Sequence, residues 1–138
     1  MSLSVSKWHF DHISVVSNTR APALAALARL LGLSDGYRPP FAFSGNWFYQ
    51  EDSPVLHAIH RPDGEEVELN HIAFRSEMPL RVLLQHLHTL QLPYQLAHVP
   101  EQAIAQVFIR FSDSLLLELD VPDSREGRAI DTTELIKE

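Results

Sequence analysis

Three histidines and one glutamate have the types and spacing of a metal-binding set. His12 is the third residue of "FDHISV" and His71 the third of "LNHIAF", two strand-like hexapeptides; His57 stands in "VLHAI" and Glu118 in "LLLEL". A histidine among apolar residues needs hydrogen-bond or metal partners when it is buried. Imidazole and carboxylate together are usual ligands of Zn, Ni, Mn or Fe(II), so we expect one of these divalent ions.

The four residues occupy matching positions of an internal repeat. His12 and His71 are 59 positions apart, and "LGL" and "LQL", which begin at residues 31 and 90, have the same offset. His57 and Glu118 are 61 positions apart. If a twofold axis relates the two halves, side chains at equivalent strand positions converge on it. The repeat therefore predicts one site with His12, His57, His71 and Glu118 as metal ligands.

The elements that must position these residues follow the order βαβββ in each half. Residues 9–16 have the β-branched and aromatic composition of a strand. Residues 17–33 have a helical pattern of apolar residues that ends at Gly32. Residues 37–59 contain three short strand candidates, separated by the turn signals "SGN" and "EDSP". The first module extends over about residues 8–62.

The second module, about residues 66–121, repeats this order. A strand at 67–74 precedes a helix at 76–92 whose apolar stripe is Leu80, Leu83, Leu84 and Leu87. Three more strands are expected between residues 94 and 121. In the last of them, alternate leucines 115, 117 and 119 suit packing on the helices, so Glu118 should point to the opposite face. Residues 122–138 form a polar tail.

The composition indicates a globular protein of one domain, residues 1–138. The chain is 45% apolar and 21% charged, with a formal charge of -7. That charge disfavours nucleic acid as a partner, since phosphate backbones are bound by Lys and Arg. Cysteine is absent, which excludes thiolate ligands. No signal peptide or membrane span is evident in the sequence, so we expect a cytoplasmic protein that is not embedded in a membrane.

The stretches "FDHISVV", "LGL", "PVLHAI", "LNHIAF" and "LLLELD" resemble the vicinal oxygen chelate superfamily, which includes glyoxalases, bleomycin resistance proteins and extradiol dioxygenases. The resemblance covers residues 8–121. It implies an α+β fold in which two tandem βαβββ modules form a cupped, incomplete barrel that binds a divalent metal. It also implies a homodimer and places metal ligands at His12, His57, His71 and Glu118.

The resemblance has two departures that bear on activity. Glyoxalase I enzymes usually carry a carboxylate where His57 stands, so a symmetric use of two metal-bound carboxylates is excluded. Many relatives have an Asp-Pro-x-Gly turn before the last strand, whereas this chain reads "FSDS" at 111–114. That turn must be built without glycine.

Three functional hypotheses follow. The first is a metal-dependent lyase or isomerase of glyoxalase type, in which the metal chelates two adjacent oxygens of a small carbonyl substrate and Glu118 or His57 removes a proton. The second is an Fe(II) ring-cleaving dioxygenase with His12, His71 and Glu118 as ligands and His57 as an acid or base beside them. The third is a non-catalytic, antibiotic-sequestering protein whose aromatic lining would be Phe41, Trp47, Tyr49 and Phe108.

Overall fold

The computed structural model describes residues 7–18, 22–63 and 67–123. Within this part, the contacts divide the chain into two compact units: residues 11–72, and residues 7–10 together with 73–123. The predicted tail lies outside the described residues from position 124 onward. Each unit is described below by itself.

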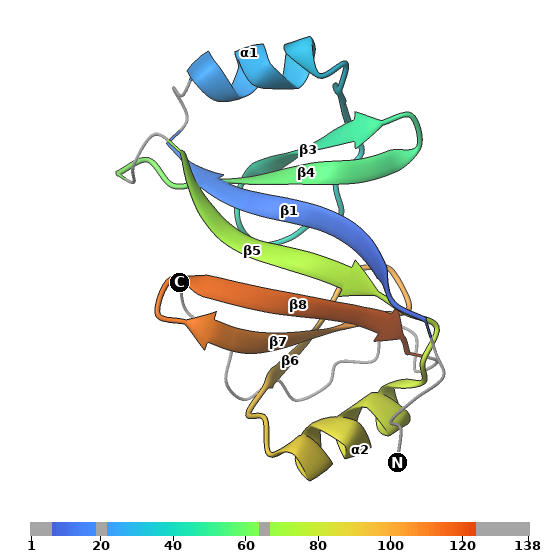
Figure 1. The fold of residues 1–138 in the computed structure, drawn as a ribbon. Helices are drawn as coiled ribbons and strands as arrows, with labels where there is room; N and C mark the ends of the chain where they lie inside the picture. The colour runs from blue at the N-terminus through green and yellow to red at the C-terminus, as the bar shows by residue number, and fades with distance from the viewer. Residues whose placement is uncertain (1–6, 19–21, 64–66, 124–138) are drawn as a thin grey trace. The chain divides into compact units, whose positions relative to one another are not determined.

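The element order is βαβββ twice, so the α+β class and the tandem repeat predicted from the sequence are confirmed (Figure 1). The first copy consists of β1 (His9–Ser17), α1 (Pro22–Leu30), β2 (Ser34–Gly36), β3 (Gly45–Gln50) and β4 (Ser53–His60). The second consists of β5 (Val67–Arg75), α2 (Leu80–Leu90), β6 (Gln95–His98), β7 (Ile104–Ser112) and β8 (Leu115–Pro122). In the unit of residues 11–72 the hydrogen-bonded strands follow the order β2-β3-β4-β1-β5, and in the other unit they follow the order β8-β7-β6. Neither described helix is long and apolar enough to cross a membrane.

One strand of the first copy lies outside its predicted range. Three strands were expected between residues 37 and 59, but β2 already ends at Gly36 and residues 37–44 form no strand. Pro39 and Pro40 explain the difference, because proline has no backbone N–H for a strand ladder.

The unit of residues 11–72 is organised around β4. Strand β1 runs parallel to β4 with Ser14 opposite His57, and β3 runs antiparallel to β4 with Trp47 opposite His57. Helix α1 lies beside β3 and β4 (Figure 1), where Leu24 packs on a small core of Val15, Leu56 and Ala58. The predicted apolar side of α1 is only partly covered, since Ala28 is 3% exposed but Leu27 is 53% exposed.

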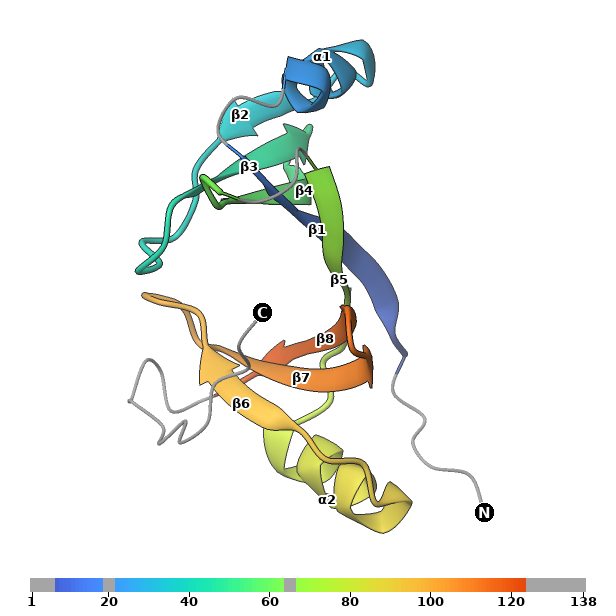
Figure 2. The same ribbon diagram turned by 90° about the vertical axis from the view of Figure 1, so that its left-hand side faces the viewer.

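The unit of residues 7–10 and 73–123 has the larger core. Helix α2 packs on one side of β7 and β8 (Figure 2) through Leu80, Leu83 and Leu87, three members of the predicted stripe. Their partners in the strands are Ala105, Val107, Ile109 and Val121. Leu117 and Leu119 also contact this core, so Glu118, with the opposite parity, faces away from α2 as predicted.

Both helices end in the same backbone motif, at the two tripeptides that revealed the repeat. After α1, Gly32 adopts a left-handed φ of 76°, and Leu33 N–H donates to the carbonyl of Ala28 at 2.8 Å. After α2, Gln91 adopts a φ of 59°, and Leu92 N–H donates to the carbonyl of Leu87 at 3.0 Å. These are Schellman caps, and only the first has the glycine that the conformation favours.

Gln91→Gly is therefore expected to raise the free energy of unfolding by about 0.5–1 kcal/mol. The left-handed conformation costs a residue with a side chain roughly 1–2 kcal/mol, and the greater freedom of glycine in the unfolded chain offsets part of that gain. Urea denaturation monitored by circular dichroism measures the change.

The reverse substitution at the equivalent position, Gly32→Gln, serves as the matched control. A side chain at residue 32 meets no atom within 4 Å, so backbone strain alone should destabilise this variant. A loss of stability in Gln91→Gly would contradict the shared cap.

Candidate metal centre

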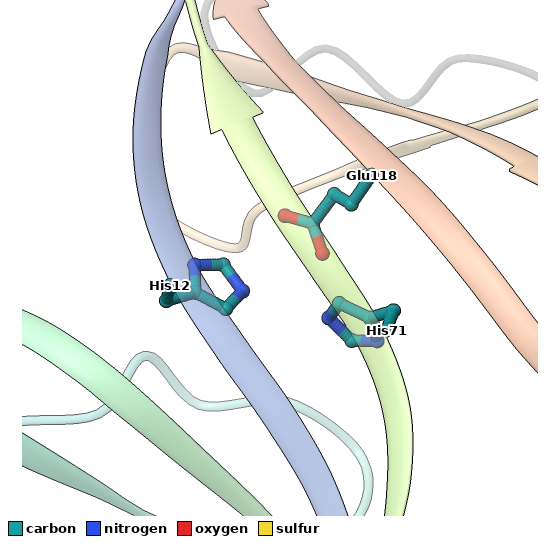
Figure 3. A group of neighbouring side chains, drawn as sticks. All are labelled: His12, His71 and Glu118. Carbon is teal, nitrogen blue, oxygen red and sulfur yellow. The ribbon is translucent and has the colours of Figure 1, made fainter.

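Two buried imidazoles face each other from β1 and β5. His12 is 3% and His71 is 8% exposed, and both belong to the unit of residues 11–72. Their ring centroids are 5.5 Å apart, with the ring planes at 75° to each other. A ring nitrogen of one lies within 4.8 Å of a ring nitrogen of the other. Figure 3 draws these two rings together with the Glu118 carboxylate.

Each of these imidazoles is held by the residue that precedes it. Nδ1–H of His12 donates to Oδ2 of Asp11 at 2.6 Å, and Nδ1–H of His71 donates to Oδ1 of Asn70 at 2.6 Å. In the neutral rings these bonds place the lone pair on Nε2 in both cases. Metal-binding histidines commonly have such a partner on the other ring nitrogen. The two rings are thus prepared in the same tautomer.

Asp11 and Asn70 were not among the residues predicted from the sequence. The signal was present, because the dipeptides "DH" and "NH" occur at the same offset as the histidines themselves. A polar acceptor directly before each histidine of a repeat is a feature that sequence inspection can use.

The third histidine, His57, is stacked between two other rings. Its centroid lies 3.6 Å from that of His12 at an interplanar angle of 17°, and 3.9 Å from that of Trp47 at 13°. Nε2–H of His57 donates to the carbonyl of Pro54 at 3.0 Å. In this tautomer the lone pair of His57 is on Nδ1.

The ring planes distinguish the three histidines as ligands. The lone pair of an imidazole nitrogen lies in the ring plane, so a coordinated ion must lie close to the planes of all its histidine ligands. The steeply crossed planes of His12 and His71 satisfy this condition. The nearly parallel planes of His12 and His57 do not meet near either ring. In this arrangement the histidine pair suited to one ion is His12 with His71.

Glu118 lies on β8, in the other unit. Its side chain is 2% exposed, and the amide of Gln106 on β7 donates to Oε2 at 3.2 Å. A carboxylate buried to this extent is rare without a partner that stabilises its charge. Gln106 orients the carboxylate much as Asp11 and Asn70 orient their imidazoles.

The four aromatic residues predicted to line a pocket fall into different surroundings. Trp47 covers His57, and Phe41 lies 6.1 Å from Trp47 between ring centroids. The hydroxyl of Tyr49 donates to the carbonyl of Tyr37, and burial followed by the influence of Tyr37 raises the pKa of Tyr49. Phe108 lies on β7, paired in register with Glu118. Trp47 and Phe41 are therefore the aromatic residues that continue outward from the histidines.

Comparison with solved structures finds the same fold in several enzymes. Methylmalonyl-CoA epimerase from Mycobacterium tuberculosis matches with a TM-score of 0.66 and 13% identity, over 88% of this chain and 92% of the epimerase. Catechol 2,3-dioxygenase matches with a TM-score of 0.65 and 16% identity, over 98% of this chain and 51% of the dioxygenase. A glyoxalase I variant from Zea mays matches with a TM-score of 0.57 and 17% identity, over 86% of this chain and 45% of the glyoxalase.

These matches show that the chain shares its fold with enzymes of the vicinal oxygen chelate superfamily, the family that the sequence motifs resemble. The chain spans nearly the whole epimerase but only about half of the dioxygenase and of the glyoxalase. No protein-family profile and no curated protein sequence matches it. At these identities the likeness establishes the fold, and the reaction must be inferred from the residues.

Proposed function

We propose that the protein is a metal-dependent enzyme whose ion is held by His12, His71 and Glu118, three of the four ligands that the sequence repeat predicts. The observation that carries this proposal is the orientation of the imidazoles: His12 and His71 have crossed planes, whereas His57 is parallel to His12. We assign the third ligand to Glu118 because it is a buried carboxylate at the repeat position of His57.

The donor set fits a divalent ion of the first transition series. It contains imidazole and carboxylate but no thiolate, since the chain has no cysteine. Two histidines and one carboxylate on a six-coordinate ion leave three positions for substrate and oxygen, which is the arrangement of non-haem Fe(II) oxygenases. We therefore favour Fe(II) over Zn, Ni and Mn.

The reaction that we propose is the cleavage of a catechol ring by dioxygen. When bound, Fe(II) would draw the two adjacent substrate oxygens and dioxygen together and mediate electron transfer between them. Both oxygen atoms of dioxygen would enter the opened product, so no external reductant is needed. The substrate is a vicinal diol, consistent with a fold whose relatives include catechol 2,3-dioxygenase.

His57 is the proposed acid–base residue of this reaction. Its Nε2 is committed to the Pro54 carbonyl, so Nδ1 is the atom that can accept a proton from a catechol hydroxyl and return it later. The stacks with His12 and Trp47 fix the plane of the ring. Trp47 also places an aromatic face beside the histidines, where it would help to exclude water.

The assay follows directly from this proposal. The protein is loaded anaerobically with Fe(II), mixed with a series of catechols in air-saturated buffer, and monitored for oxygen uptake and for the visible absorption of ring-opened products. We expect oxygen uptake equal to the catechol consumed. Inactivity of the Fe(II)-loaded protein toward the whole series would reject ring cleavage.

The lyase or isomerase hypothesis is tested in parallel. It requires His57 or Glu118 to remove a proton beside a carbonyl while Zn, Ni, Co or Mn stabilises the enediolate. Proton exchange and isomerisation of hemithioacetals by protein loaded with these metals, in the absence of ring cleavage, would replace the dioxygenase by this alternative. Metal-independent ligand binding without turnover would favour the sequestering protein.

Asp11 and Asn70 supply a prediction that concerns metal affinity alone. Asp11→Ala and Asn70→Ala are each expected to weaken binding of Co(II) by roughly 10–100-fold, the usual effect of removing a partner of a coordinating histidine. Competition with a chromophoric chelator measures the affinity. Glu68→Ala, an exposed substitution on the same strand as Asn70, is the control. Unchanged affinity in both variants would show that the hydrogen-bonded imidazoles are not ligands.

We further propose that the protein acts as a homodimer, as the resemblance implies. Light scattering coupled to size-exclusion chromatography distinguishes a dimer from the 15.7 kDa monomer.

A further inference from the structure

Arg38 lies next to the last ring in a series of neighbouring rings that starts at His57. Trp47 stacks on His57, Phe41 lies next to Trp47, and the guanidinium carbon of Arg38 is 5.1 Å from the centroid of Phe41. The same carbon is 5.0 Å from the centroid of Phe43. All of these residues belong to the unit of residues 11–72, so their arrangement is internal to that unit.

The position of the guanidinium is closely defined. Nη2 of Arg38 donates to the carbonyl of Phe43 at 2.9 Å. A side-chain carbon added at Gly45 would lie only 3.1 Å from Nε and from Nη2 of Arg38, and 2.3 Å from the carbonyl oxygen of Ala58. Glycine at residue 45 thus leaves the space in which the guanidinium sits.

Among the described residues, no acidic neighbour balances the charge of Arg38. In the described ranges 7–18, 22–63 and 67–123, no carboxylate forms an ion pair with Arg38, and its buried Nε has no hydrogen-bond partner. Burial lowers the pKa of the guanidinium from its ordinary value, although arginine stays charged at neutral pH. A partly desolvated guanidinium attracts an anion from solution more strongly than a fully hydrated one does.

We infer that Arg38 binds an anionic group, a carboxylate or a phosphate, carried by the substrate whose vicinal oxygens reach the metal. The inference rests on the proposed function for the chelating end of that substrate. Gly45 lies two residues along β3 from Trp47, and one strand spacing separates Trp47 from His57. Because Arg38 lies against Gly45, an anionic group bound to Arg38 is on the order of 10 Å from His57. Arg38 selects a diol with an anionic tail over a compact catechol.

The test uses three probes with the same catechol head and a six-carbon tail: 6-(3,4-dihydroxyphenyl)hexanoate, its neutral methyl ester, and the phosphate monoester of the corresponding alcohol. Anaerobic calorimetry with Co(II)-loaded and metal-free protein gives the affinities. We expect at least one anionic probe to bind about tenfold more tightly than the ester. The stronger of the two anions shows which group Arg38 prefers.

Arg38→Gln should remove this preference and leave the affinity for the ester unchanged. Arg110→Gln, an exposed arginine on β7, should change neither affinity. Arg38→Lys keeps the charge without the planar fork and should retain part of the preference, which provides a test even if Arg38→Gln does not fold. Equal affinity of the wild-type protein for acid, phosphate and ester would overturn the inference, as would a preference that survives Arg38→Gln.

Failure of the proposed function would give a different pattern. In that case Co(II) would not change the affinity for any probe, while an anionic probe would still bind more tightly than the ester through Arg38. If Co(II) strengthens binding of all three probes to the same extent and no anion is preferred, the metal site stands and the role of Arg38 is rejected.

Discussion

Replacement of His71 by alanine is expected to abolish tight metal binding and all detectable ring cleavage. His71 provides one of the two crossed imidazole planes, and without it a single histidine and a carboxylate remain. The loss in affinity should exceed the roughly 10–100-fold expected for the neighbouring Asn70, because a coordinating atom is removed and not only its orienting partner. Inductively coupled plasma analysis and Co(II) titration measure the binding, and oxygen uptake measures the activity.

His60→Ala is the matched control for this substitution. His60 is also a strand histidine, but it bonds to Ser44 through Nδ1 and has the opposite parity to His57 on β4. This variant should bind Co(II) as the wild-type protein does. Full metal occupancy in His71→Ala would contradict the proposed ligand set.

His57→Phe is expected to lower kcat by roughly 10²–10⁴-fold, the usual contribution of a general acid or base, while metal affinity changes little. Phenylalanine keeps an aromatic ring between His12 and Trp47 but has no nitrogen to carry a proton. The effect should fall on kcat more than on KM, since the metal and the chelating oxygens remain in place.

The different effects of His57→Phe on metal affinity and on kcat distinguish an acid–base residue from a metal ligand. If His57→Phe lost metal as completely as His71→Ala, the four-ligand set expected from the repeat would be restored and the lyase hypothesis would gain. If turnover were unchanged with metal retained, His57 would have no part in proton transfer.

Much of the fold was predictable because the residues that define the repeat have clear physical roles. The tripeptides "LGL" and "LQL" mark the two helix ends, and the middle residue of each tripeptide has a left-handed conformation. The stripe of Leu80, Leu83 and Leu87 is the buried side of α2. Parity alone assigned Glu118 to the face opposite the helix, because strand geometry fixes side-chain direction with little help from context.

Other features depend on side-chain torsions and loop packing, which the residue pattern does not specify. The alternation of side chains along β4 predicted the face on which His57 lies but not the plane of its ring. The stack on His12 and the hydrogen bond to Pro54 were therefore not predictable. Strand β2 lies before its predicted range because of the loop that follows it. Arg38 was one of several arginines in the sequence, and only the contacts of its guanidinium distinguish it.

The most direct measurement is a Co(II) titration of four proteins under identical conditions: wild type, His57→Phe, His71→Ala and Glu118→Gln. We predict one tightly bound Co(II) per chain in the wild type and in His57→Phe, and none in the other two. Loss of binding in His57→Phe, or undiminished binding in Glu118→Gln, would contradict a site built from His12, His71 and Glu118.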